Sequence, residues 1–169
     1  MSNDYLTALG AAMTIPERQY LRDLATQAAA EFGPACTVVN IGVALGCSCV
    51  CLRAGAPESN LVGIDIDPEA ERGDWALIRA DSRRFTLPPP IHLLFVDGAH
   101  DYAAVKSDIE RWAPSVILGG FVAFHDYGNH DKIPWTAGVK RAVDECMNGD
   151  GWTVIGTTDS IKTFQKLGG

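Results

Sequence analysis

The stretch Val39-Asn40-Ile41-Gly42-Val43-Ala44-Leu45-Gly46-Cys47-Ser48 decides the fold. It begins inside a short β-branched run, residues 37–42, which is typical of a buried strand. It then passes two glycines and enters a helix expected over residues 46–53. Glycine at such a turn lets a ligand approach the backbone, and the first turn of a helix offers free N–H groups. The stretch therefore predicts a strand, a ligand-binding turn and a helix.

Helices and strands alternate on both sides of this unit. A leading helix is expected over residues 15–32, because Thr14 and Glu17 form a capping-box pattern around Pro16. Residues 1–14 are then an N-terminal extension. Apolar spacing predicts two later helices, one from Tyr102 to Trp112 and one that includes Trp135 and runs to residue 146. Further strands are expected at residues 61–66, 75–78, 91–96, 121–124, 152–155 and 161–164, with a break at residues 119 and 120 before the fifth strand.

This alternation indicates an α/β fold with a doubly wound sheet. Strands that are apolar over their full length are typical of a mainly parallel sheet covered on both faces. The last two expected strands have only a short connection, so they must pair antiparallel or separate. A chain of 169 residues fits one domain. We therefore expect a single domain over residues 1–169.

Charge and hydropathy restrict the partners. The formal net charge is -7 and the basic residues are scattered, which argues against a nucleic acid as the partner. No apolar run approaches the length of a membrane span, so no membrane partner is expected. The first residues lack the pattern of a secretory signal. We therefore expect a cytoplasmic protein.

The chain has five cysteines, and three of them occupy positions 47, 49 and 51. Zinc sites usually pair two cysteines and add a second pair elsewhere, which this sequence does not offer. Small, partly apolar side chains at these positions are favoured as helix-to-sheet packing, because free cysteine is commonly buried.

Polar residues follow each expected strand. Asp65 comes after the second strand, and a carboxylate there can accept hydrogen bonds from ribose hydroxyls. Doubly wound sheets bind ligands beyond the carboxyl ends of their strands, so these residues are expected to converge on one site. The other polar residues of this set are Asp81 and Ser82 after the third strand, Asp97, His100 and Asp101 after the fourth, and His125, Asp126 and His130 after the fifth.

Five motifs in consistent order resemble one known family. They are VNIGVALGCS at residues 39–48, VGIDIDP at 62–68, FVDGAHDY at 95–102, GGFVAFHDY at 119–127 and VKRAV at 139–143. Together they resemble the class I S-adenosylmethionine-dependent methyltransferases, closest to the small bacterial sugar O-methyltransferases of the macrocin and aminocoumarin type (methyltransferase domain 24). The resemblance implies a Rossmann-like sheet of seven strands in the order 3-2-1-4-5-7-6, with the last strand antiparallel.

The resemblance also implies a division of roles within the site. The cofactor S-adenosylmethionine would contact residues of the first four strand ends: Asn40, Gly42, Gly46, Ser48, Asp65, Ile66, Asp81, Ser82 and Asp97. A divalent metal, magnesium, manganese or zinc, would be held by Asp97, His125 and Asp126. His100 or His130 would act as the general base, since histidine titrates near working pH.

The expected reaction is methyl transfer to a hydroxyl group of a small-molecule acceptor, with possible help from the metal. Two alternatives remain open. Asn40 stands where the family pattern has an acidic residue, and no substrate lid is visible, so an inactive cofactor-binding or interaction module is one. A non-haem iron oxygenase is the other, because two histidines and a carboxylate can bind iron. A homodimer is also possible.

Overall fold

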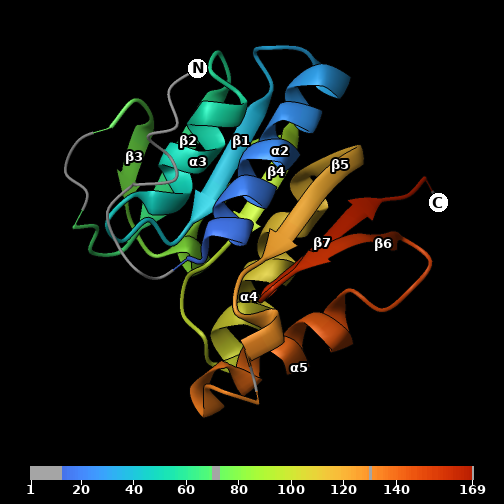
Figure 1. The fold of residues 1–169 in the computed structure, drawn as a ribbon. Coiled ribbons are helices and arrows are strands. Elements are labelled where there is room, and N and C mark those ends of the chain that lie inside the picture. The colour runs from blue at the N-terminus through green and yellow to red at the C-terminus, as the bar shows by residue number, and fades with distance from the viewer. Residues whose placement is uncertain (1–12, 70–72, 130, 169) are drawn as a thin grey trace.

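The computed structural model describes residues 13–69, 73–129 and 131–168, and Figure 1 shows the fold. Seven strands form one sheet in the order β3-β2-β1-β4-β5-β7-β6, which confirms the predicted fold class. The strands are β1 (Thr37–Ile41), β2 (Asn60–Asp65), β3 (Ala76–Arg79), β4 (Ile91–Val96), β5 (Val116–Phe124), β6 (Trp152–Thr158) and β7 (Ile161–Lys166). The helices are α2 (Ile15–Phe32), α3 (Cys47–Gly55), α4 (Tyr102–Trp112) and α5 (Ala137–Cys146).

The first five strands are parallel, and the last two are joined by a tight connection. β1 pairs in parallel with β2 and β4, so all three end at the same edge of the sheet. β7 lies between β5 and β6 and is antiparallel to both. The short link after Thr158 permits only this antiparallel pairing. The parallel strands thus bring their carboxyl ends together at the edge where the site was expected.

Two core clusters cover the two faces of the sheet. One contains residues of α2 and α3, such as Leu21 and Leu52, and the other contains residues of α4 and α5, such as Ile109. Neighbouring strand residues alternate between the clusters, as Phe95 and Leu94 do in β4. This period of two follows from the pleat of a strand buried on both sides. Figure 1 shows α2 and α3 on one side of the sheet, with α4 and α5 on the other.

The start of α2 has the predicted capping box. The side chain of Thr14 accepts from the backbone N–H of Glu17, and the Glu17 carboxylate accepts from the N–H of Thr14. The helix covers residues 15–32, as expected. Most of residues 1–14, the expected extension, lie outside the described residues, and the prediction of one domain stays a prediction.

The fifth strand differs from the prediction, because the two glycines do not interrupt it. β5 begins at Val116 and runs through Gly119, which has a φ of +78°. The pairing with β4 shifts register between Ile91 and Leu93. The glycines therefore accommodate a bulge in a continuous strand, and the predicted break at residues 119 and 120 is wrong.

Two other segments decide the shape of the site. The helix expected to include Trp135 begins only at Ala137, and Trp135 lies in a preceding 3-10 turn (Pro134–Thr136). Between β3 and β4 there is a 3-10 turn over Ser82–Arg84.

The cysteines of α3 are buried in the core, with Cys49 and Cys51 at 0% exposure, so the packing interpretation is confirmed. No helix in the described ranges is both long and apolar enough to cross a membrane.

Candidate active site

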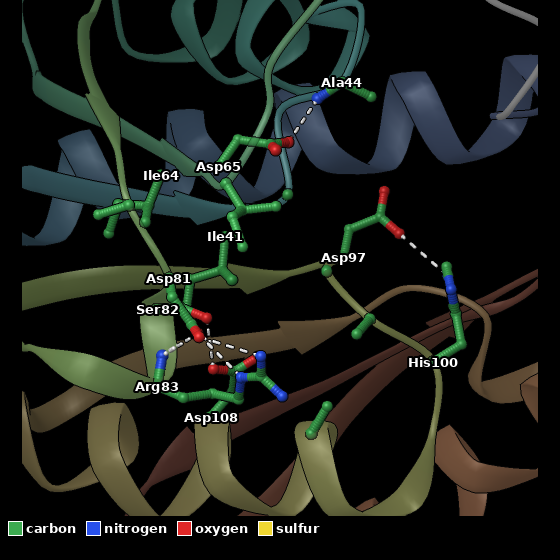
Figure 2. Close-up of a pocket in the computed structure, with 16 residues that line it drawn as sticks. Ile41, Ala44, Ile64, Asp65, Asp81, Ser82, Arg83, Asp97, His100 and Asp108 are labelled. Carbon is green, nitrogen blue, oxygen red and sulfur yellow. Dashed lines mark hydrogen bonds and ion pairs between the residues drawn. The ribbon is translucent and has the colours of Figure 1, made fainter.

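A cleft of about 420 Å³ opens at the carboxyl ends of the parallel strands, and Figure 2 shows its lining. It collects residues from the ends of β1, β2, β3 and β4, which are far apart in the sequence. Six of the predicted cofactor residues line it: Gly42, Asp65, Ile66, Asp81, Ser82 and Asp97. His100 also lines it. Its volume is within the ~300–1,000 Å³ typical of small-molecule sites.

The turn after β1 requires glycine at Gly42 for a packing reason. Gly42 has a φ of +86°, and a Cβ placed on it would lie 1.9 Å from the carbonyl oxygen of Asp97. The turn therefore packs directly on the end of β4. Gly46 also has a positive φ, 87°, and forms the N-cap of α3 without lining the cleft. Gly42 thus brings the backbone of the first turn against Asp97, and Gly46 lets the chain enter α3.

Asp65 holds the same turn in place. Its Oδ2 atom accepts from the backbone N–H groups of Val43 (2.8 Å) and Ala44 (2.9 Å). Its Oδ1 atom accepts from the N–H of Asp67 at 2.9 Å. A carboxylate oxygen has two acceptor positions, so Oδ1 can accept one further hydrogen bond. Asp65 is half-buried at the cleft, so the position predicted for ribose binding is geometrically suitable.

Asp81 and Ser82 form the far end of the cleft in Figure 2. Asp81 accepts from the guanidinium of Arg83 at 2.8 and 3.0 Å, and this pairing lowers the pKa of Asp81 to about 2. The Ser82 hydroxyl donates to Asp108 at 2.7 Å. Burial raises the pKa of the Asp108 carboxyl. Both predicted residues are therefore fixed by neighbours that the sequence reading did not single out.

Asn40 and Ser48 lie under the turn, and neither lines the cleft. Asn40 is fully buried, and its amide donates to Ser48 Oγ (2.9 Å) and to Cys49 Sγ (3.1 Å). Its Oδ1 atom is buried without a hydrogen-bond partner in the part of the chain that the structure describes. In this arrangement Asn40 links β1 to α3. A direct contact of Asn40, Gly46 or Ser48 with the cofactor stays a prediction.

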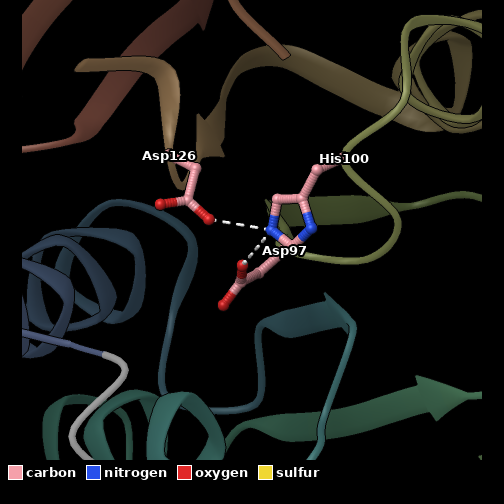
Figure 3. A group of neighbouring side chains, drawn as sticks. All are labelled: Asp97, His100 and Asp126. Carbon is pink, nitrogen blue, oxygen red and sulfur yellow. Dashed lines mark ion pairs between the residues drawn. The ribbon is translucent and has the colours of Figure 1, made fainter. Parts of the chain in front are cut away.

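The other end of the cleft has a cluster of two aspartates and a histidine. His100 Nε2 lies 2.8 Å from Asp126 Oδ2 and 3.9 Å from Asp97 Oδ1. Figure 3 shows both carboxylates facing the same ring nitrogen. Asp97 follows β4 directly, and Asp126 follows β5 with a φ of 60°. Asn129 donates to Asp126 at 2.7 Å and fixes its orientation.

His125, the predicted metal ligand, lies between the two aspartates and a buried glutamate. Its Nδ1 lies 3.1 Å from Asp97 and 3.5 Å from Asp126, and its Nε2 lies 3.5 Å from Glu17. Burial alone would lower the pKa of His125, but hydrogen bonds to Asp126, Asp97 and Glu17 outweigh it and raise that pKa to about 12. A ring that carries a proton on both nitrogens has no lone pair to give a metal. Within the described residues, the compact group of possible ligands has His100 in the place expected for His125.

Glu17 is a buried residue beneath the site that the sequence did not indicate. It is 2% exposed, and its carboxylate accepts from the Ser160 N–H (2.9 Å) and hydroxyl (2.5 Å). Burial would raise the pKa of Glu17, but hydrogen bonds from His125, Ser160 and Thr14 bring it to about 2. The sequence pattern indicated only that Glu17 caps the start of α2. It did not indicate that Glu17 also contacts His125 and Ser160 beneath the strand ends. His130, the other candidate base, lies outside the described residues.

The donor atoms of Asp97, His100 and Asp126 fit a divalent metal. One atom from each residue lies within 4.8 Å of the others. Carboxylates with an imidazole suit manganese, zinc or iron, whereas magnesium prefers oxygen ligands. The cleft also fits a nucleoside, because it places a half-buried carboxylate beside a glycine turn and a helix start.

A seven-stranded sheet in this order, with a nucleoside-sized cleft at a glycine turn, is the architecture of the S-adenosylmethionine-dependent methyltransferase class. The sequence model of a family described as "Methyltransferase domain" matches residues 39–127, more than half of the chain. The chain belongs to this methyltransferase-domain family, and the resemblance inferred from its motifs is confirmed.

Solved structures show the same fold at low sequence identity. The O-methyltransferase NovP superposes with a TM-score of 0.71 at 14% identity, covering 94% of this chain and 83% of NovP. The methyltransferase MycE, in complex with Mg and SAH, gives 0.68 at 17% identity, covering 98% of this chain and 53% of MycE. The N-methyltransferase NodS from Bradyrhizobium japonicum WM9 gives 0.63 at 17% identity, covering 90% and 97%.

One curated relative matches by sequence over a shorter stretch. An uncharacterized protein of Acanthamoeba polyphaga mimivirus is 36% identical over 62 residues, which cover 37% of this chain and 27% of that protein. The match thus spans about a quarter of the relative.

Proposed function

We propose that this protein transfers the methyl group of S-adenosylmethionine to a hydroxyl oxygen of a small-molecule acceptor. One observation carries the proposal. The cleft that suits a nucleoside continues without interruption to Asp97 and His100, beside Asp126, so donor and acceptor would meet at the end of β4. Holding two reactants in line is a large source of catalysis in such transfers.

In this proposal the cofactor end binds and orients the methyl donor. Asp65 accepts a hydrogen bond from a ribose hydroxyl at Oδ1, with the lone pair that its three backbone partners leave free. Ile66 is 66% exposed at the cleft and offers an apolar surface to the nucleoside. Asp81 and Ser82 lie next to the base. When bound, S-adenosylmethionine supplies a methyl group made electrophilic by its sulfonium.

The acceptor end handles the proton. A neutral alcohol is a poor nucleophile, so its proton must leave as the carbon–oxygen bond forms. His100 is the described histidine at the cleft with a ring nitrogen beside two carboxylates. A proton taken up by this ring is stabilised by Asp126, as in other carboxylate–histidine pairs. The methyl group would come from the bound cofactor, whose sulfur would keep the electron pair of the broken bond, and the hydroxyl proton would go to His100.

Asp97, His100 and Asp126 are also the residues that would hold a divalent metal. When bound there, the ion would lower the pKa of a hydroxyl coordinated to it. The proposal therefore has two forms, in which His100 either accepts the proton or coordinates the metal. They differ in their response to a chelator.

The experiment is a transfer assay with labelled S-adenosylmethionine, catechol and sugar acceptors, with and without a chelator. We expect Asp126→Asn to lower kcat at least ~100-fold, the lower range for loss of acid–base catalysis, with S-adenosylhomocysteine affinity changed less than about threefold. Asp23→Asn, an exposed carboxylate on α2, is the matched control and keeps full activity. Loss of activity on chelation, restored by manganese, assigns His100 to the metal.

Two results would contradict the proposal. A protein that does not bind S-adenosylhomocysteine in calorimetry is not a methyltransferase of this kind. A protein that binds it tightly and turns over none of the hydroxyl acceptors is the inactive module considered above.

We place the enzyme in the cytoplasm as part of the same proposal, because all five of its cysteines are free.

A further inference from the structure

Trp135 is an aromatic side chain that the fold leaves in solvent beside the acceptor end. It is 61% exposed, whereas Trp112 is fully buried in the core. Its ring lies edge-to-face with the His100 ring, with 4.8 Å between the centroids and 76° between the planes. An indole this exposed contributes little to the core, yet it contacts the histidine of the site.

The segment that carries Trp135 is held firmly against the segment that carries His100. Thr136 is fully buried, and both its N–H and its hydroxyl donate to the Ile133 carbonyl, at 3.0 and 2.8 Å. Gly138 packs so closely that a Cβ on it would lie 2.5 Å from the His100 carbonyl oxygen and 2.5 Å from the Tyr102 nitrogen. The backbone segments that carry Trp135 and His100 are therefore held next to each other by close packing.

We propose that Trp135 is the stacking surface for the methyl acceptor and that it selects acceptors with a ring. This inference rests on the proposed function, since it names the acceptor class of that site. A flat indole face stacks on an aromatic ring or on the apolar face of a sugar, and it gains little from a flexible open chain. A ring stacked on Trp135 would lie beside His100, which is next to Asp97 and Asp126.

The test compares two ring acceptors, catechol and methyl β-D-glucopyranoside, with the open-chain 2,3-butanediol. We expect Trp135→Ala to raise KM for ring acceptors about 2- to 10-fold, the value of one stacking contact. KM for butanediol and kcat should change less than about twofold. Trp135→Phe should restore most of the ring preference. Comparing catechol with the glucoside shows which kind of ring is bound.

Leu118→Ala is the matched control, because Leu118 is also largely exposed, at 64%, but lies in the first half of β5, away from the cleft. It should change neither KM. Gly138→Ala tests the same contact without removing the indole, because it displaces the Trp135 segment from His100. We expect it to raise KM for ring acceptors as well.

Failure of this inference is separable from failure of the proposed function. Where turnover is too slow to measure, binding of catechol and the glucoside is titrated calorimetrically into protein saturated with S-adenosylhomocysteine. If S-adenosylhomocysteine binds and Trp135→Ala leaves ring binding unchanged, the stacking role is wrong and the methyltransferase proposal stands. Equal increases in KM for rings and butanediol would also overturn it, since they indicate a general change of the site.

Discussion

The two ends of the cleft hold their carboxylates by different means. At the cofactor end, Asp65 accepts from three backbone N–H groups. At the acceptor end, Asp97 and Asp126 lie against the rings of His100 and His125. Backbone amides fix a carboxylate while leaving its charge and one acceptor position available. Imidazoles balance its charge and can exchange protons with it.

This difference shows how one sheet edge serves two tasks. The cofactor end needs a rigid acceptor for neutral hydroxyls, and local backbone suffices to supply it. The acceptor end concentrates charge, which requires partners from elements distant in the sequence. His125 connects Glu17 of α2 to the aspartates that follow β4 and β5. Perturbing each end should therefore give separable effects.

The largest effect is expected where the two ends meet, at Gly42. Gly42→Ala adds a Cβ that lies 1.9 Å from the Asp97 carbonyl oxygen, at a φ of +86°. Because the neighbour is backbone, the turn or β4 must move. We expect the free energy of unfolding to fall by about 3–5 kcal/mol, and both S-adenosylhomocysteine binding and turnover to be lost. Chemical denaturation and calorimetry measure these changes.

Gly119→Ala separates the cost of backbone strain from the cost of a steric clash. Gly119 also has a positive φ, +78°, but its added Cβ would meet only Phe32, at 3.8 Å. We expect a loss of about 1–2 kcal/mol and intact binding. Equal losses for the two variants would show that the contact between the turn and β4 does not matter.

The second prediction concerns the acceptor end and is the pH dependence of the free energy of unfolding. The folded-state pKa of Glu17 is about 2, below its ordinary 4.5, so its stabilising contribution is present above pH 4.5 and lost as pH falls to about 2. The pKa of His125 is about 12, above 6.5, so its contribution is present below pH 6.5 and lost as pH rises through about 12. The cluster is thus most stabilising between pH 4.5 and 6.5.

Glu17→Gln should lower the free energy of unfolding by about 2–3 kcal/mol at pH 6, with the deficit shrinking as pH falls below 4.5. Denaturation curves measured from pH 2.5 to 7 give this difference. Glu31→Gln is the matched control, since Glu31 is an exposed carboxylate on the same helix. A deficit that does not depend on pH would mean that Glu17 acts by packing alone.

The fold was predictable because its signals are local. β-branched runs, the capping box at Thr14 and the glycine turn each determine nearby backbone, and strand order followed from the family resemblance. The wrong prediction of a strand break at Gly119 also came from a local signal. A glycine pair permits either a break or a bulge, and only pairing with β4 decides between them.

The site was predictable in position and less so in detail. Strand-end residues such as Asp65 and Asp97 lie where the sheet rule placed them. The directions of the histidine rings were not predictable: Nδ1 of His125 faces Asp97 and Asp126, and its Nε2 faces the buried Glu17 of α2. No sequence pattern linked Glu17 to His125, which is 108 residues away. Long-range charge pairing therefore accounts for most of what sequence reasoning could not supply.

The smallest effect is expected for the cofactor end alone. Asp65→Asn keeps one carbonyl oxygen for the Val43 and Ala44 amides, but it presents an NH2 group to the N–H of Asp67 or to the ribose. We expect S-adenosylhomocysteine affinity to fall about 10-fold, or ~1.4 kcal/mol, with kcat at saturating cofactor nearly unchanged. Asp67→Asn is the matched control, because Asp67 is 88% exposed and pairs with Arg79. A fall in kcat without a change in affinity would assign Asp65 to the chemistry and contradict the separation of the two ends.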